Sequence, residues 1–164
     1  MSIIHIPDYL DTYRVLTQAV EGLSPEELKW KSAPESWSIT EVLAHLADHN
    51  LVVSFRIRDV LAGTTAQLPA FNQDAWVYGQ KANESSSDEI LNVYQSLLQY
   101  NSLLFGRLTE GDWEKTGVNF KGETVTAAAI ISGFIRHVHH HIGQINRIKE
   151  ALAAGSTQDG VPQA

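Results

Sequence analysis

The feature that most constrains the fold is the spacing of apolar residues in four long segments of the chain. In each segment these residues recur every three or four positions, which places them on one face of an α-helix. No part of the chain shows a convincing apolar–polar alternation of the kind that predicts a β-strand. We therefore predict an all-α four-helix bundle, because each helix must bury its apolar face against the others. The predicted helices span residues 7–22, 38–63, 87–108 and 124–153.

The connection between the second and third predicted helices is unusually long. It covers residues 63–86, which is enough chain for a crossover from one end of the bundle to the other. Connections of this length in compact domains are usually functional or partly structured. Because this one contains Phe71 and Trp76, we expect it to form a lid or rim against the bundle. We predict one domain at residues 1–153, followed by a flexible tail at residues 154–164.

The composition excludes several classes of function. The chain has 164 residues and a formal net charge of −7, and it has no run of Lys and Arg that would suit a nucleic-acid partner. It contains no cysteine, which excludes disulfides, thiolate metal sites and a cysteine nucleophile. No apolar stretch approaches the roughly 18 residues that cross a membrane, and the N-terminus lacks the pattern of a signal peptide. We expect a cytoplasmic protein that binds neither nucleic acid nor membranes.

Four of the seven histidines lie in the sequence HVHHH at residues 137–141. His137 and His141 are four residues apart, so both imidazoles lie on one face of the predicted last helix, on the flank of its apolar stripe. His139 points almost opposite, which favours a solvated side chain. His140 falls between the two directions, and we expect it to face solvent or to support the site. The pair His137 and His141 is therefore the start of a candidate metal site.

Catalytic sites of the zinc type use three protein ligands and leave one position open. His45 and His49, on the second predicted helix, are the candidates for the third ligand, and helical geometry alone slightly favours His49. The zinc-protease motif HEXXH is absent, because Val138 occupies the position of its glutamate. The Glu-x-x-His pairs of di-iron bundles are absent as well. An all-histidine set suits zinc, nickel or iron better than magnesium or calcium.

Two segments resemble a known family. WSITEVLAHLADHN, at residues 37–50, is similar to a Trp-Ser segment that leads into a histidine, and HVHHHIGQI, at residues 137–145, is similar to a motif H-x-x-H-H-x-x-Q-I. The connections FNQDAW and GDWEKTG also look like those of the family. In their order and spacing, these segments resemble the DinB-like, YfiT-type family of candidate metal-dependent hydrolases.

The resemblance implies a four-helix bundle that holds one divalent metal through His45, His137 and His141. It thus favours His45 over His49 by analogy, where geometry alone left the choice open. Some members of the family are thiol-dependent S-transferases or isomerases, which implies a small-molecule substrate and possible use of a low-molecular-weight thiol. Homodimers are common in the family, so a homodimer is expected here by the same analogy.

This chain departs from the family at Asn50, where relatives often carry an acidic residue. Glu41 and Asp48 are weak candidates for its role, although Glu41 is already explained as the partner of Ser38 in a capping box and Asp48 as a solvated charge. Gln144 could hydrogen-bond a bound water or substrate, or it could make a polar contact within the bundle.

Arg56 follows His45 and His49 along one line of the second helix and could meet an anionic substrate, although a solvated arginine is the simpler interpretation. Two functions therefore remain open. The first is a hydrolase or thiol S-transferase with an open coordination position on its metal. The second is a non-catalytic bundle that binds a small molecule or forms a dimer. Its metal would be structural, with His49 or His140 as a fourth ligand that closes the open coordination position.

Overall fold

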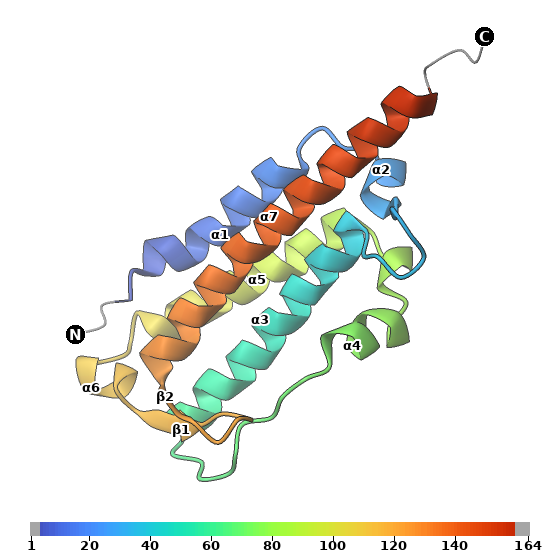
Figure 1. Cartoon of the computed structure of the whole chain (residues 1–164). Coiled ribbons are helices and arrows are strands. Elements are labelled where there is room, and N and C mark those ends of the chain that lie inside the picture. Colours follow the sequence, from blue (N-terminus) through green and yellow to red (C-terminus); the bar gives the residue numbers. More distant parts are fainter. Residues whose placement is uncertain (1–3, 160–164) are drawn as a thin grey trace.

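The computed structural model describes residues 4–159, with side chains described as far as residue 155. Its main body is a bundle of four long helices (Figure 1), which confirms the predicted fold class. α1 and α3 each pack against both α5 and α7, so that α1 lies diagonally across the bundle from α3. The helices are α1 (Ile6–Val20), α3 (Ile39–Leu61), α5 (Ser87–Phe105) and α7 (Ala127–Asp159).

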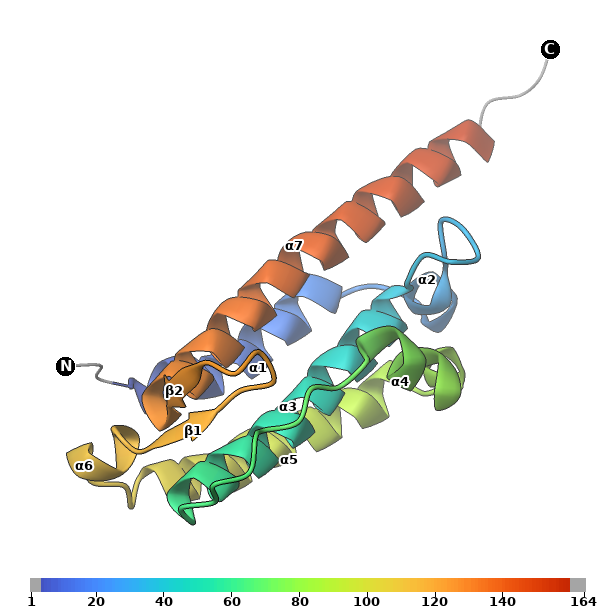
Figure 2. The same ribbon diagram turned by 60° about the horizontal axis from the view of Figure 1, so that its bottom comes forward.

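The long crossover between α3 and α5 is also confirmed. α3 and α5 run in the same direction and α1 and α7 run in the other, so the chain must return along the bundle before α5 begins (Figures 1 and 2). The crossover is partly structured, because it contains α4 (Gln73–Gly79) and the short 3-10 helix η1 (Ala82–Glu84). Leu68 and Val77 are buried, so the segment packs onto the bundle as expected.

Local capping sequences determine where α3 begins. The hydroxyl of Ser38 accepts a hydrogen bond from the backbone N–H of Glu41, and the Glu41 carboxylate accepts one from the backbone N–H of Ser38. Both side chains are buried. The same reciprocal pair, Ser24 and Glu27, starts the short helix α2 (Pro25–Lys29) between α1 and α3. These bonds satisfy N–H groups that every helix leaves free in its first turn.

The second connection contains strands that the sequence patterns did not predict. After the one-turn helix α6 (Glu110–Trp113), β1 (Thr116–Val118) and β2 (Thr124–Thr126) form a small antiparallel hairpin. Because residues 124–126 pair with β1, α7 begins at residue 127 and not at the expected residue 124. At its other end, α7 continues to residue 159, past the expected end near residue 153. The rest of the expected tail, residues 160–164, lies outside the described residues.

The core of the bundle combines aromatic and aliphatic side chains with a buried polar network. Tyr9 is completely buried, and its ring contacts Phe105 and Phe134 at centroid distances of 5.0 and 5.5 Å. Its hydroxyl donates to Asn50 Oδ1 at 3.1 Å and accepts from Asn101 Nδ2 at 3.0 Å. Within residues 4–159, no helix combines the length and hydrophobicity that crossing a membrane requires.

Candidate metal centre

Three histidine side chains from two helices meet on one side of the bundle. His45 comes from α3, and His137 and His141 come from α7, which packs directly against α3. His45 Nε2 lies 3.3 Å from His137 Nε2, which in turn lies 3.0 Å from His141 Nε2. One nitrogen from each ring lies within 4.8 Å of the other two. The spacing of His137 and His141 by one helical turn is what points both rings at His45.

These distances suit nitrogen ligands of a tetrahedral metal. Two nitrogens that each lie about 2.05 Å from zinc, at the tetrahedral angle, are about 3.3 Å apart. A purely hydrogen-bonded arrangement fits less well. His141 Nδ1 donates to Gln144 Oε1 at 2.7 Å, which leaves His141 Nε2 without a proton in the neutral ring. His137 Nε2 carries at most one hydrogen, so it cannot donate to both His45 Nε2 and His141 Nε2.

The surroundings keep these imidazoles neutral, which is the form that binds metals. Burial, with a smaller contribution from the neighbouring histidines, lowers the pKa of His45 from 6.5 to about 3 and that of His137 to about 4. Burial also lowers the pKa of His141, although its hydrogen bond to Gln144 acts in the opposite direction. A cluster of neutral nitrogen lone pairs is therefore available near pH 7.

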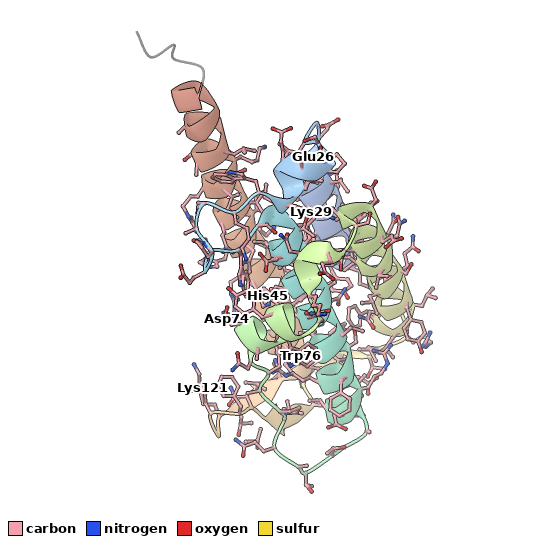
Figure 3. All side chains as sticks on the ribbon, turned by 90° about the vertical axis from the view of Figure 1, so that its right-hand side faces the viewer. Glu26, Lys29, His45, Asp74, Trp76 and Lys121 are labelled. Carbon is pink, nitrogen blue, oxygen red and sulfur yellow. The ribbon has the colours of Figure 1, made fainter. Side chains whose placement is uncertain are left out.

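Aromatic side chains surround the cluster. The ring of Trp37, just before α3, lies 5.2 Å from that of His45 and 6.5 Å from that of His141. Phe71 from the crossover stacks on His45 at 5.9 Å and touches Trp76 of α4. In Figure 3, α4, with Asp74 and Trp76, lies in front of the part of α3 that carries His45. The sequence predicted Phe71 as part of a lid or rim and placed Trp37 at the start of the family-like segment 37–50. It did not predict that Trp37 would contact the histidine rings.

His49, His139 and His140 lie outside the group of converging nitrogens. His139 and His140 are both exposed. His49 lies next to the cluster, with its ring centroid 4.2 Å from that of His137 and its Nδ1 buried without a hydrogen-bond partner among the described residues. The group of converging nitrogens contains His45 and does not contain His49. Tertiary packing therefore brings His45 to the position that helical phase alone slightly favoured for His49.

Two of the weak catalytic candidates, Glu41 and Asp48, bond to residues outside the histidine cluster. Glu41 completes the capping box and also pairs with Lys31 Nζ at 3.2 Å. Asp48 is buried, not solvated as the simpler interpretation had it, and accepts a hydrogen bond from Gln80 Nε2 at 2.6 Å. Asn50, where the family often has an acid, belongs to the buried network around Tyr9. Gln144 is the exception, because it bonds directly to His141.

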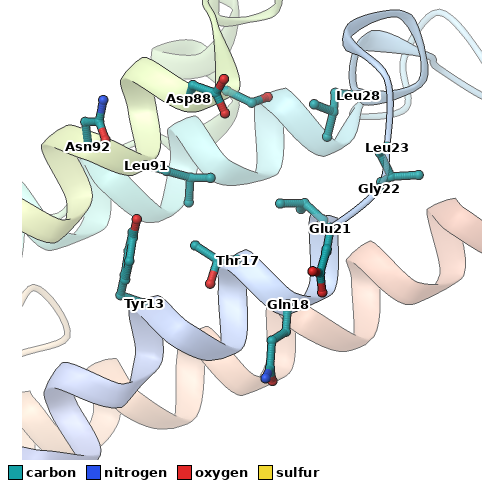
Figure 4. Close-up of a pocket in the computed structure, with 12 residues that line it drawn as sticks. Tyr13, Thr17, Gln18, Glu21, Gly22, Leu23, Leu28, Asp88, Leu91 and Asn92 are labelled. Carbon is teal, nitrogen blue, oxygen red and sulfur yellow. The ribbon is translucent and has the colours of Figure 1, made fainter.

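A cleft gives access to the histidine cluster from one side. Its volume is about 560 Å³, and it lies between α7, the segment before α3 and the start of α4. His141 and Gln144 line it together with Trp37, Asp74 and Arg147. A larger cavity of about 760 Å³ lies between α1 and α5, where Tyr13, Thr17 and Asn92 line it (Figure 4). No histidine lines that cavity, so the smaller cleft is the one next to the candidate centre.

Comparison with known proteins identifies the family of this chain. The sequence profile of the DinB superfamily matches residues 9–145, which include both histidine-bearing segments. This chain belongs to the DinB superfamily. It is 26% identical over 140 residues to a candidate metal-dependent hydrolase of Oceanobacillus iheyensis, and the match covers 83% of this chain and 79% of the relative.

Solved structures related to this DinB protein share its fold. YfiT from Bacillus subtilis, described as a candidate metal-dependent hydrolase with an unusual four-helix bundle topology, matches with a TM-score of 0.82 and 21% identity, over 90% of this chain and 85% of YfiT. A mycothiol-dependent maleylpyruvate isomerase matches with a TM-score of 0.67 and 14% identity, over 87% of this chain and 61% of the isomerase. At these identities the two matches establish the fold alone.

Proposed function

We propose that this DinB protein is a metal-dependent enzyme that binds one divalent transition-metal ion through His45, His137 and His141. The observation that carries the proposal is the convergence of three Nε2 atoms. His137 Nε2 lies 3.3 Å from His45 Nε2 and 3.0 Å from His141 Nε2. The reaction is hydrolysis of a small molecule or transfer of a low-molecular-weight thiol. The relatives support both, since one group is described as candidate metal-dependent hydrolases and one structural neighbour is a mycothiol-dependent isomerase.

Zinc, nickel and iron are the metals that fit three imidazoles best. When bound, such an ion acts as a Lewis acid and lowers the pKa of a bound water or thiol, so one set of ligands can serve both reactions. The residues around the histidines hold and shield that set. Gln144 fixes the ring orientation and tautomer of His141, while Trp37 and Phe71 keep bulk water away from His45. The cleft beside His141 opens one side of the centre to solvent.

The first test is metal content, measured by plasma mass spectrometry on untagged protein that was purified without a nickel column. We expect close to one equivalent of metal in the wild type and little in the variants His45→Ala, His137→Ala and His141→Ala. His139→Ala is the matched control, because it removes an exposed histidine from the same helix and should keep the metal. Full metal content in all three cluster variants, after each metal has also been added back, would contradict the proposal.

A non-catalytic, closed metal site is the second candidate, because His49 lies close enough to His137 to be considered as a fourth ligand. Cobalt-substituted protein separates the two possibilities. In an open site, added azide should bind to cobalt and change its visible spectrum. In a closed site, azide should leave the spectrum unchanged in the wild type and change it in His49→Ala.

We also propose a homodimer, which the family resemblance implies, and a cytoplasmic location, which the sequence led us to expect. The outer face of α5 has the apolar residues that an interface needs, since Val93, Tyr100 and Leu103 are 52%, 62% and 66% exposed. Analytical ultracentrifugation should then give twice the monomer mass, and cell fractionation should recover the protein with cytoplasmic markers. A monomer at micromolar concentration would contradict the first proposal, and recovery in another fraction would contradict the second.

A further inference from the structure

Arg56 has no anionic partner among the residues that the structure describes. Its Nη2 donates to the backbone oxygen of Pro69 at 2.6 Å, while its Nε is buried without a hydrogen-bond partner in the described part of the chain. No acidic side chain among the described residues forms an ion pair with it. Arg14, by contrast, pairs with the carboxylate of Asp11. A partly buried guanidinium without a counter-charge is costly, so its retention requires a reason.

The position of Arg56 relates it to the histidine cluster. His45, His49 and Arg56 are spaced by four and seven residues along α3, so they lie on one face of the helix. His49 and Arg56 are about 10 Å apart along the axis, a gap that an arginine side chain largely spans. Arg56, His45 and His49 therefore share one face of α3.

The crossover covers both ends of this line. The ring of Phe71 stacks on those of His45 and His49 at centroid distances of 5.9 and 6.0 Å. Two residues earlier, the backbone oxygen of Pro69 accepts the hydrogen bond from Arg56. The outer side of the same segment borders an apolar groove of about 270 Å³. Val52 and Phe55 of α3 line that groove with Pro69 and Phe71, so an alkyl chain would find apolar surface at Pro69, the residue to which Arg56 donates.

We propose that Arg56 is the recognition residue for a carboxylate on an apolar chain, carried by the substrate or the thiol of the histidine centre. The inference rests on the proposed function and names a class of substrate for it. A carboxylate fits because its two oxygens match the fork of a guanidinium, and no acidic side chain among the described residues pairs with that of Arg56.

The test uses hexanoate as probe, with 6-mercaptohexanoate and 6-mercaptohexanol as its thiol-bearing relatives and sodium chloride at equal ionic strength as control. Dissociation constants are measured by calorimetry on full-length wild type, Arg56→Gln, Arg56→Lys and Arg147→Gln. Each protein is measured both metal-free and zinc-loaded. Because the chain has no cysteine, the thiol probes cannot form mixed disulfides with it. Arg147 is the matched control, because it is exposed on the cleft side of the same centre.

We expect hexanoate to bind the wild type and Arg147→Gln alike, and to bind Arg56→Gln about 10- to 100-fold more weakly. Arg56→Lys should be intermediate, because it keeps the charge and loses the fork. Tighter binding of 6-mercaptohexanoate than of hexanoate to the zinc form would assign the carboxylate to the thiol, and equal binding would assign it to a separate substrate. In both cases the carboxylate probe should bind Arg56→Gln more weakly than it binds the wild type.

Three results would overturn the inference: no binding of hexanoate to the wild type, equal binding to the wild type and Arg56→Gln, or loss in Arg147→Gln instead. A residue that only ties down the crossover would lower the melting temperature of Arg56→Gln and leave the dissociation constant unchanged. The two proposals fail separately. Absence of metal would end the proposed function, while the metal-free measurement would still decide the role of Arg56.

Discussion

Asp48 is a buried carboxyl group whose hydrogen-bond partner, the amide of Gln80, carries no charge. Burial raises its pKa above the usual 3.8, and the hydrogen bond offsets only part of that effect. The folded state therefore binds a proton at Asp48 more tightly than the unfolded chain does. Its contribution to stability is complete below about pH 3.8 and is lost as the pH rises through the folded-state pKa. At neutral pH the ionised side chain therefore lowers the stability of the folded state.

Asp48→Asn should therefore stabilise the protein at pH 7 by about 0.5–1 kcal/mol, because an amide oxygen can accept the same bond from Gln80 without the cost of a buried charge. The gain should shrink as the pH is lowered toward 4. Urea unfolding at several pH values measures both effects. A loss of stability at pH 7 would mean that the carboxylate has a favourable partner or function in the native protein.

At the scale of single elements, the start of α3 matters more than the start of α2, although both use a capping box of the same type. Ser38 is completely buried, and its hydroxyl also donates to Asn83 Oδ1 at 2.6 Å, which ties the crossover to the helix that carries His45. Ser24 is only partly buried and starts a helix of five residues.

Ser38→Ala should lower the free energy of unfolding by about 2 kcal/mol, at the upper end of the effect of losing an N-cap, because the buried partners lose their hydrogen bonds. Ser24→Ala, the matched control, should cost about 0.5–1 kcal/mol. Chemical denaturation of both variants gives the comparison. Equal costs would show that burial and the bond to Asn83 add nothing to the cap.

The hairpin depends on a close approach to α3. A Cβ atom at Gly117 would lie 2.9 Å from Val60 Cγ2, which is too short for an undisturbed contact, and Val60 is buried. Gly117→Ala should therefore destabilise the protein by about 1–3 kcal/mol. Gly79→Ala is the control, since a Cβ at that helical position meets nothing within 4 Å and should be neutral or slightly stabilising. Thermal unfolding that ranked the two variants in the opposite order would contradict this packing.

At the scale of the whole molecule, the bundle concentrates buried imidazoles at one place. Burial lowers the pKa of His45, His49 and His137 from 6.5 to about 3, 2 and 4. The unfolded chain binds protons near pH 6.5 that the folded chain rejects. The stability that these groups contribute is therefore present above pH 6.5 and is lost as the pH falls toward 4.

Metal-free protein should accordingly lose stability between pH 6.5 and 4, by roughly 1.4 kcal/mol per pH unit for each excess proton that the unfolded state binds. His137→Ala should show a shallower dependence because it removes one of these groups. Addition of zinc should raise the melting temperature at pH 7 and have less effect near pH 5, where protons compete for the same nitrogens. Calorimetry across this range measures all three effects, and a flat profile would contradict the burial of neutral histidines.

The sequence by itself determined the parts of this protein that depend on neighbours along the chain. The four helices, the start of α3 at Ser38 and the pairing of His137 with His141 all follow from contacts three or four residues apart, which helical geometry enforces locally. The crossover was predicted from the length of the connection at residues 63–86, which is enough chain to return along the bundle. Boundaries were less accurate where another element intervenes, as at residues 124–126, which pair with β1 and so delay the start of α7.

Only the tertiary structure decided which residues from different helices meet. His45 and His49 are almost equivalent along the chain, and the packing of α3 against α7 selects His45 for the group of converging nitrogens. The ring contacts of Trp37 and Phe71, the bond from Arg56 to Pro69 and the diagonal placement of α1 and α3 have the same origin. These contacts join residues distant in sequence, and their geometry is set by how whole helices pack, which no local spacing records.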